Sequence, residues 1–237
     1  MKIHRFIGKY NLKNKGELNI SDKESVSQIR NVLKLHVGEQ IILGDGELNE
    51  AVCKIRSVDR NSVAVEIMEL KMNRNETGNY GILYCSILKK ENFELVVQKT
   101  TELGIKEIIP IIAERTVKLN LNRERLEKIM KESAEQSGRG QLPILGEILS
   151  FYKAVEYAKD NDLNIFFDAS GGLINKTEVI GKKIGIWVGP EGGWAYGEMK
   201  EVLRQTQDKF IIINLGKLIL RAETAAIVGS FLINKFE

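Results

Sequence analysis

Two glycine-bearing turns near the C-terminus decide how this chain folds. The first reads Trp187-Val188-Gly189-Pro190-Glu191-Gly192-Gly193-Trp194, and the second reads Asn214-Leu215-Gly216-Lys217-Leu218-Ile219-Leu220-Arg221-Ala222-Glu223-Thr224. Each follows a short apolar run typical of a buried strand, at 183–188 and 210–213, and each precedes a helix-like stretch. Ligands bind where parallel strands end and the chain turns toward a helix. The two turns therefore predict one ligand site at the carboxyl ends of two strands.

The composition of these turns suits contact with a ligand. Three glycines remove side chains around Pro190 and Glu191, so the first turn can be tight and its amides and carbonyls can approach a ligand closely. Arg221 and Glu223 place charge at the start of the last helix. Gly-Pro and Gly-Gly pairs also mark ordinary turns, so these features do not identify the ligand by themselves.

The rest of the second half alternates between strand and helix signals. Strands are expected at 81–88, 107–112 and 164–167, and helices at 91–103, 122–137, 151–160 and 222–236. Gly104 is placed to end the first of these helices in the left-handed conformation. A third turn is expected at 168–172, after the strand that ends at Phe167. This order predicts an α/β domain over residues 81–237, with a parallel sheet and helices outside it.

Residues 1–70 have the pattern of a small β-rich unit. A short helix is expected within 19–36 with Ser21 as its cap, then a strand at 39–43 and a hairpin formed by 51–58 and 62–68. Short strands joined by tight turns indicate a small barrel, a fold that can bind RNA. Residues 71–80 are polar and turn-prone, which predicts a linker.

Composition excludes several kinds of site. The 237 residues carry a net charge of +3, which is compatible with an RNA partner without requiring one. Two histidines and two unclustered cysteines argue against a zinc site or a histidine-based triad, so no metal is expected. The sequence has no GxGxxG after its first strand, no P-loop and no GxSxG elbow. Without a membrane-length apolar run or a signal peptide, a cytoplasmic protein that does not enter the membrane is expected.

The two turns together carry a specific resemblance. GPEGGW at 189–194 and LGKLILRAETA at 215–225 resemble the knot region of the SPOUT class of S-adenosylmethionine-dependent RNA methyltransferases. More narrowly, they are similar to the RsmE family, which methylates ring nitrogen 3 of a uridine in 16S ribosomal RNA. Further matches lie at 4–6, 31–38, 98–105, 114–116 and 135–139, so the resemblance covers nearly the whole chain. Lys34 departs from it, because an arginine is usual there.

The resemblance implies a fold, a cofactor and partners. The expected fold is a SPOUT-type trefoil-knot domain preceded by a small PUA-like β-barrel, and the expected cofactor is S-adenosylmethionine. The expected partners are 16S rRNA, within the 30S subunit, and a second copy of the chain in a homodimer. The cofactor-binding residues carried over are Phe167, Gly189, Glu191, Gly192, Leu215, Gly216, Ile219 and Leu220, with Asp168 at the border of the pocket. The RNA-binding residues carried over are Arg5, Lys34, Arg115 and Arg139.

Arg221 and Glu223 are the expected catalytic residues. The imide nitrogen of uracil is protonated at neutral pH, so its methylation needs proton removal or a stabilised anion. Arg221 could pair with a uracil oxygen as negative charge develops, and Glu223 could orient Arg221 or accept a proton through water. The same pair could instead only stabilise a helix start. Two other functions stay open: a SPOUT methyltransferase for another rRNA or tRNA nucleotide, and a non-catalytic RNA-binding protein of ribosome assembly.

Overall fold

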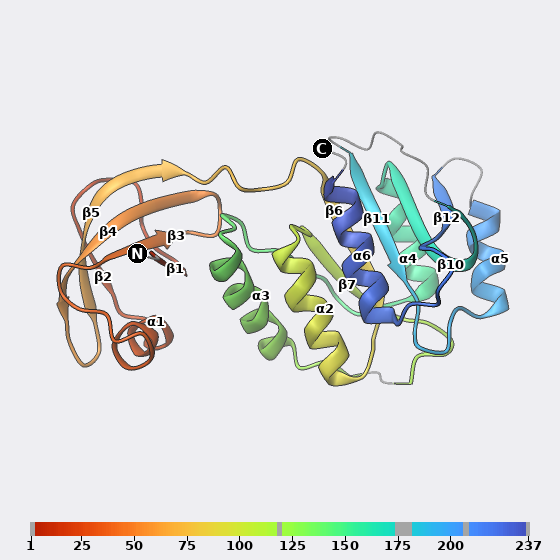
Figure 1. Ribbon diagram of the computed structural model, residues 1–237, viewed down its shortest axis with the longest axis horizontal. Coiled ribbons are helices and arrows are strands. Elements are labelled where there is room, and N and C mark those ends of the chain that lie inside the picture. Colours follow the sequence, from red (N-terminus) through yellow and green to blue (C-terminus); the bar gives the residue numbers. More distant parts are fainter. Residues whose placement is uncertain (1–2, 118–119, 174–181, 206–208, 236–237) are drawn as a thin grey trace. The chain divides into compact units, whose positions relative to one another are not determined.

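The structure, a computed structural model, describes residues 3–117, 120–173, 182–205 and 209–235. The chain divides into two compact units (Figure 1). Unit 1 comprises Met1–Glu76 and Ala134–Leu142, and unit 2 comprises Thr77–Ser133 and Pro143–Glu237. The sequence predicts two domains that are each continuous along the chain. It does not predict that residues 134–142 belong to unit 1.

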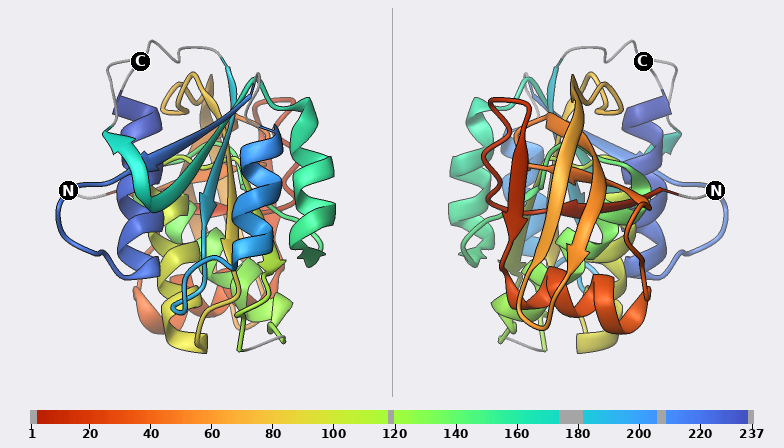
Figure 2. Two further views of the ribbon diagram at one scale, coloured as in Figure 1. Left: turned by 90° about the vertical axis from the view of Figure 1, so that its right-hand side faces the viewer. Right: turned by 90° about the vertical axis from the view of Figure 1, so that its left-hand side faces the viewer.

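Unit 1 is built on a curled five-stranded sheet with the order β1-β3-β4-β5-β2 (Figure 2, right). The strands are β1 (His4–Ile7), β2 (Glu17–Ile20), β3 (Gln40–Gly44), β4 (Asn49–Val58) and β5 (Val63–Met72). The expected hairpin is confirmed, because β4 and β5 pair antiparallel. Ala51, Cys53 and Ile55 alternate along β4 and enter one core, which is the period expected of a half-buried strand.

The short helix of unit 1 begins one residue later than its expected cap. Helix α1 (Lys23–Ser27) starts after Asp22, whose side chain accepts a hydrogen bond from the Ser25 amide at 2.8 Å. The prediction of Ser21 as the cap is therefore wrong, because the aspartate occupies the position from which a side-chain oxygen reaches the amides of the first turn. The chain continues from α1 into a π-helical turn, η1 (Gln28–Val32).

Residues 134–142 are tied to unit 1 by side-chain hydrogen bonds. Glu135 accepts from the Ile7 amide at 2.8 Å, and the Gly138 carbonyl accepts from the side-chain amides of Asn73 and Asn75 at 3.0 Å each. Gly138 has φ +85°, a conformation that favours glycine. These bonds explain why a segment that follows much of unit 2 in sequence belongs to unit 1.

Unit 2 contains a parallel sheet with the order β12-β10-β11-β6-β7-β8, and β9 also pairs with β7. Every pairing in it is parallel, which confirms the expected α/β class. Its strands are β6 (Tyr80–Ser86), β7 (Glu107–Ile112), β8 (Ile144–Leu145), β9 (Leu149–Ser150), β10 (Leu163–Leu173), β11 (Lys183–Val188) and β12 (Phe210–Asn214).

Helices cover both faces of this sheet (Figure 2, left). One face packs against α2 (Lys90–Glu102), α3 (Arg123–Ser137) and α6 (Ala222–Lys235), and the other against α4 (Phe151–Tyr157) and α5 (Tyr196–Gln205). A 3₁₀ turn, η2 (Ala158–Asp160), follows α4. Along β6, Leu83 and Cys85 enter the first core while Ile82 and Tyr84 enter the second. Gly104, just past α2, has the expected left-handed φ of +89°.

The third turn expected at 168–172 is wrong. These residues lie within β10, which shifts register against β12: Phe167 pairs with Ile213, and Gly172 pairs with Ile213 again. A Cβ on Gly171 would lie 2.7 Å from backbone atoms of β12. The glycine therefore lets the strand bulge and stay against its neighbour, where a larger residue would have pushed the chain away.

The C-terminal segment returns across the sheet. Strand β12 lies at one edge, yet α6, which follows it after the second glycine turn, packs on β11 and β6 in the middle of the sheet. This return is the arrangement expected for a trefoil-knot domain, and it brings the start of α6 toward the ends of the central strands.

Candidate functional site

The two glycine turns follow the carboxyl ends of two parallel strands, so they lie on the same side of the sheet. They follow β11 and β12, which are both parallel to β10 and flank it. The indole nitrogen of Trp194, in the first turn, donates to the Phe167 carbonyl at 3.0 Å. The side-chain amide of Asn214, which opens the second turn, donates to the Ala169 carbonyl at 2.9 Å. Both turns are therefore hydrogen-bonded to β10, at carbonyls only two residues apart along the strand.

The first turn is tight because its glycines permit it. The Gly193 amide donates to the Pro190 carbonyl at 2.8 Å, and Gly193 has φ +71°. A Cβ on Gly189 would lie 2.9 Å from the indole ring of Trp194, so the ring covers the space in which a side chain would stand. The turn thus presents backbone atoms rather than side chains, apart from the exposed Glu191.

The second turn is open at its glycine. Gly216 has φ +129°, its amide donates to the Asn214 side chain at 2.9 Å, and a Cβ there would meet no atom within 4 Å. Beyond it, Leu218 and Ile219 are 79% and 92% exposed, while Leu215 and Leu220 are partly buried. In the second turn, main-chain atoms at Gly216 that no side chain covers are therefore followed by exposed apolar side chains.

An acidic side chain from each turn lies close enough to Cys85 to affect the pKa of its thiol. Burial raises the pKa of the Cys85 thiol at the end of β6, and the charges of Glu191 and Glu223 raise that pKa further. Glu223 is 8% exposed, and its Oε2 has no hydrogen-bond partner among the described residues. Arg221 lies at the start of α6 with its Nη1 4.0 Å from Glu223 Oε1, and its side chain is 86% exposed. An exposed cation and a buried carboxylate thus stand together at the helix start.

A loop that follows β7 is attached to the first turn. Arg115 donates from Nη1 to the Gly192 carbonyl at 2.9 Å. Glu198 of α5 is 1% exposed and accepts from the Glu114 amide at 2.9 Å and from the Ala195 amide at 2.8 Å. Sequence reasoning missed Glu198, although a glutamate three residues into a helix is a known capping signal. The hydrogen bond of Arg115 attaches it to the first glycine turn, and its expected contact with RNA stays a prediction.

Two other expected RNA-binding residues are engaged inside unit 1. Arg5 donates to Glu50 at 2.9 Å, and Glu50 is 2% exposed. Arg139 contacts Glu76 at 3.0 Å, and its side chain is 4% exposed. Each guanidinium thus contacts a carboxylate of its own unit, and the expected RNA contacts of these two residues stay predictions. Lys34 differs, since it is exposed on unit 1 with φ +53°.

The described residues contain no group of three or more His, Cys, Asp or Glu side chains that could hold a metal ion. None of the helices that they form is long and apolar enough to cross a membrane.

Comparisons with known proteins identify both units. Residues 79–234 match the RNA methyltransferase domain family, and residues 22–68 match the RNA methyltransferase PUA domain family. Ribosomal RNA small subunit methyltransferase E of Bacillus subtilis (strain 168) is 32% identical over 217 residues, covering 85% of this chain and 84% of that protein. The protein of the same name from Rickettsia conorii is 29% identical, covering 97% of this chain and 94% of its own length.

Solved structures agree with this. The ribosomal RNA small subunit methyltransferase E of Neisseria gonorrhoeae, bound to S-adenosylmethionine, superposes with a TM-score of 0.88 at 26% identity, over 99% of this chain and 98% of its own. A Legionella pneumophila protein solved with the same cofactor gives a TM-score of 0.89 at 26% identity, over the same shares of the two chains.

Proposed function

The chain belongs to the ribosomal RNA small subunit methyltransferase E family, and from this premise we propose that it methylates ring nitrogen 3 of a uridine in 16S rRNA, using S-adenosylmethionine. The observation that carries the proposal is that both glycine turns are hydrogen-bonded to β10, through Trp194 and Asn214. Ligands of parallel sheets bind at the carboxyl ends of the strands, which supports a single cofactor site at these two turns.

The residues of this edge fit the cofactor. An adenine ring requires backbone donors and acceptors with apolar surface beside them, and the turn around Gly216 provides both. The positive sulfonium requires nearby negative charge, and Glu191 and Glu223 provide it. S-adenosylmethionine, when bound, supplies an electrophilic methyl group. We assign the cofactor to the main chain of 189–192 and 215–220, with Phe167 and Asp168 at its border.

Arg221 is the residue that we assign to the uracil. Its side chain is 86% exposed, so the guanidinium is accessible to a substrate. Positioned against a uracil oxygen, it would stabilise the negative charge that forms as the imide nitrogen loses its proton. Glu223 Oε1 lies 4.0 Å from the Arg221 guanidinium, and its Oε2, which has no hydrogen-bond partner among the described residues, provides an acceptor for a proton passed through water.

We also propose that two copies of the chain work together in the cytoplasm. Leu218 and Ile219 expose most of their apolar surface in the second turn, next to the residues assigned to the cofactor. Contact with another subunit would bury such side chains. Light scattering of the purified protein tests this, because a monomer at micromolar concentration would contradict it.

The proposed reaction is tested on small ribosomal subunits from cells that lack this protein. Incubation with S-adenosylmethionine should produce 3-methyluridine in 16S rRNA, detected by mass spectrometry of the digested RNA. Arg221→Ala should lower the rate by roughly 10²- to 10³-fold, as expected when one group that stabilises developing charge is lost, while calorimetry should show cofactor binding retained. Arg204→Ala, which removes an exposed arginine of α5, is the matched control. Methylation at another position of the base, or an unaffected Arg221→Ala variant, would contradict the proposal.

A further inference from the structure

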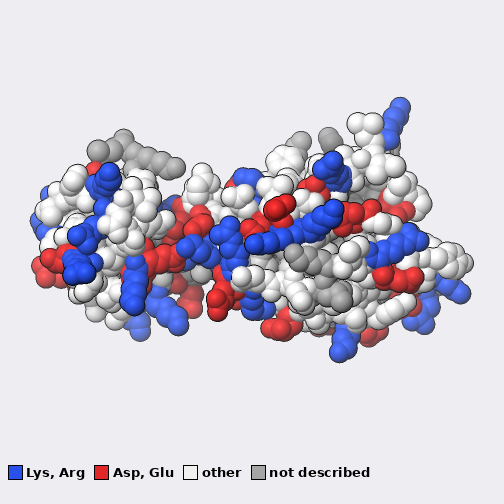
Figure 3. All heavy atoms as spheres, turned by 90° about the horizontal axis from the view of Figure 1, so that it is seen from below, with Lys and Arg blue, Asp and Glu red and all other residues white. Residues whose placement is uncertain are grey.

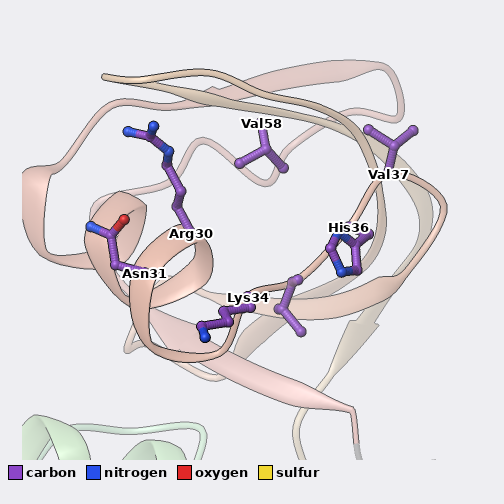
Figure 4. A pocket seen from close by; sticks show the side chains of 7 residues that line it. Arg30, Asn31, Lys34, His36, Val37 and Val58 are labelled. Atoms are coloured by element: carbon purple, nitrogen blue, oxygen red, sulfur yellow. The ribbon is translucent and has the colours of Figure 1, made fainter.

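Unit 1 carries a hollow of about 540 Å³ between the turn η1, the loop that follows it and the end of β4 (Figure 4). Lys34 lines this hollow, and the family resemblance already gives Lys34 as an RNA contact. The hollow is therefore part of the RNA-binding role expected of unit 1. A separate feature of unit 2, at the amino ends of its strands, has no role in the proposed reaction.

That feature is the side chain of Glu107, at the start of β7. Basic and acidic side chains are interspersed on the face shown in Figure 3, which is how surface charges are usually balanced. Glu107 is 8% exposed, and no lysine or arginine of the described residues forms an ion pair with it. The Tyr157 hydroxyl donates to its Oε1 at 3.2 Å. Carboxylates are rarely buried in a protein without a cation or several donors beside them.

The other buried glutamates have more partners. Within the described part of the chain, these are Glu50, Glu198 and Glu223. An arginine lies next to Glu50 and next to Glu223, and two main-chain amides donate to Glu198. Glu107 has a single phenol hydroxyl in their place. It therefore lacks the positive charge or the second donor that compensates each of the others.

The residues around Glu107 present aromatic rings and apolar surface. Tyr80, at the start of β6, is 40% exposed, and Tyr157, at the end of α4, is 46% exposed. Ile144 of β8 pairs with Glu107 and is also exposed. Burial raises the pKa of both tyrosines and the charge of Glu107 raises it further, so the two rings lie close to the carboxylate. The charge of Asp160 raises the pKa of Tyr157 as well, so this surface is negative.

A cation of β11 lies near the Tyr157 ring but not against Glu107. The Lys183 ammonium is 6.0 Å from the centroid of that ring. Among the residues that the structure describes, it forms no ion pair with Glu107 or with another carboxylate. The ring thus attracts a cation already, and the Glu107 carboxylate stays without one at ion-pair distance.

An arginine side chain fits this set of groups. Its planar guanidinium can donate two N–H bonds to one carboxylate while its face lies on an aromatic ring. A metal ion would require several oxygen ligands, and the set provides one buried carboxylate. The exposed surfaces of Tyr80, Tyr157 and Ile144 are also larger than a free amine can cover. Arginine and tyrosine carry much of the binding energy of protein interfaces.

We propose that the Glu107 cluster, formed by Glu107, Tyr80, Tyr157 and Ile144, binds an arginine side chain of a partner protein. The guanidinium pairs with the Glu107 carboxylate and lies against the tyrosine rings. The cluster is at the amino ends of the strands, and the turns assigned to S-adenosylmethionine are at the carboxyl ends, so the two sites can be occupied at the same time. The inference does not depend on the reaction that the protein catalyses.

NMR titration with short peptides tests the inference. The protein has six tyrosines, so the ring signals of Tyr80 and Tyr157 can be assigned in tyrosine-labelled protein from the variants Tyr80→Phe and Tyr157→Phe. The peptide acetyl-Gly-Arg-Gly amide should shift both signals, with saturation in the millimolar range. The same peptide with citrulline in place of arginine has a similar shape without the charge. It should bind about tenfold more weakly, as expected when a hydrogen bond to a charged group is lost.

Two variants test the contribution of each part of the cluster. Glu107→Gln removes the charge and keeps the size of the side chain, and it should weaken binding of the arginine peptide by about tenfold. Tyr80→Ser removes an exposed ring and should weaken it as well. Glu132→Gln, which removes an exposed carboxylate of α3, is the matched control and should leave binding unchanged. Calorimetry with S-adenosylmethionine should give the wild-type affinity for all three variants, because the cofactor site is at the other ends of the strands.

Three results would overturn the inference. The first is an arginine peptide that does not move the signals of Tyr80 and Tyr157, and the second is equal binding of the arginine and citrulline peptides. The third is wild-type affinity for the arginine peptide in Glu107→Gln and Tyr80→Ser. Spermidine that shifts both signals at lower concentration than the peptide would assign the cluster to free amines, and would also contradict an arginine of a partner. None of these results bears on the methylation assay, so the proposed function is tested separately.

Discussion

Replacing Glu198 by alanine should loosen the first glycine turn and destabilise unit 2. The carboxylate is 1% exposed and accepts two main-chain hydrogen bonds, from Glu114 and from Ala195. A hydrogen bond to a charged group contributes about 1.5–3 kcal/mol. The Ala195 amide is in a buried residue and would lose its partner outright, whereas the Glu114 amide is in an exposed residue where water can replace the carboxylate. We therefore expect the free energy of unfolding to fall by about 3–4 kcal/mol.

Denaturant unfolding followed by tryptophan fluorescence measures this loss. Glu198→Gln keeps one carbonyl acceptor and should lose about half as much, and Glu147→Ala, which removes an 87% exposed carboxylate, should change stability by less than about 0.5 kcal/mol. Since Glu198 fixes the loop from which Arg115 reaches Gly192, Glu198→Ala should also weaken S-adenosylmethionine binding at least tenfold in calorimetry. Stability within 1 kcal/mol of wild type together with unchanged cofactor affinity would refute this reasoning.

Three further perturbations probe other parts of the chain. Gly229→Ala should lower the free energy of unfolding by about 1–3 kcal/mol, measured in denaturant, because its Cβ would lie 2.3 Å from the Phe167 ring; wild-type stability would contradict this packing. Burial raises the pKa of Cys53 to about 11 from 9.0. Between pH 9 and 11 only the unfolded Cys53 thiol ionises, so this residue should contribute a loss of roughly 2–3 kcal/mol in the free energy of unfolding. The decline measured over this range should be smaller in Cys53→Ala by that amount. Arg139→Met should lower the free energy of unfolding by about 3–5 kcal/mol, because it leaves the Glu76 carboxylate without its arginine. The double variant Arg139→Met/Glu76→Gln should recover part of this loss, which a double-mutant cycle measures.

Local patterns of the sequence predicted the framework of unit 2 well. Continuous apolar runs located its central strands, and Gly104 marked the end of α2 because a left-handed residue is needed there. The prediction of a turn at 168–172 is wrong because a glycine such as Gly171 permits two conformations that the sequence does not distinguish. One is a turn away from the sheet, and the other is the close approach of one strand to another. Only the position of β12 beside β10 decides between them.

Sequence patterns did not predict which groups the charged side chains contact within the chain. Arg5, Arg115 and Arg139 all suit RNA, yet each contacts a carboxylate or carbonyl that is distant in sequence. Their partners are fixed by tertiary structure, so residue type alone cannot separate a committed cation from an available one. Glu198 was overlooked for the converse reason, since its importance comes from a bond to Glu114, which is 84 positions away.

We propose that the turns at 189–193 and 214–221 form a single cofactor site, and hydrogen–deuterium exchange with and without S-adenosylmethionine can detect whether the cofactor contacts both. Amides of both turns should exchange more slowly when the cofactor is added. The protection of the two turns should rise over the same range of cofactor concentration and reach saturation together. The loop at 33–38 of unit 1 should be unaffected. Protection confined to one turn, or absent from both while the cofactor binds elsewhere, would contradict the account.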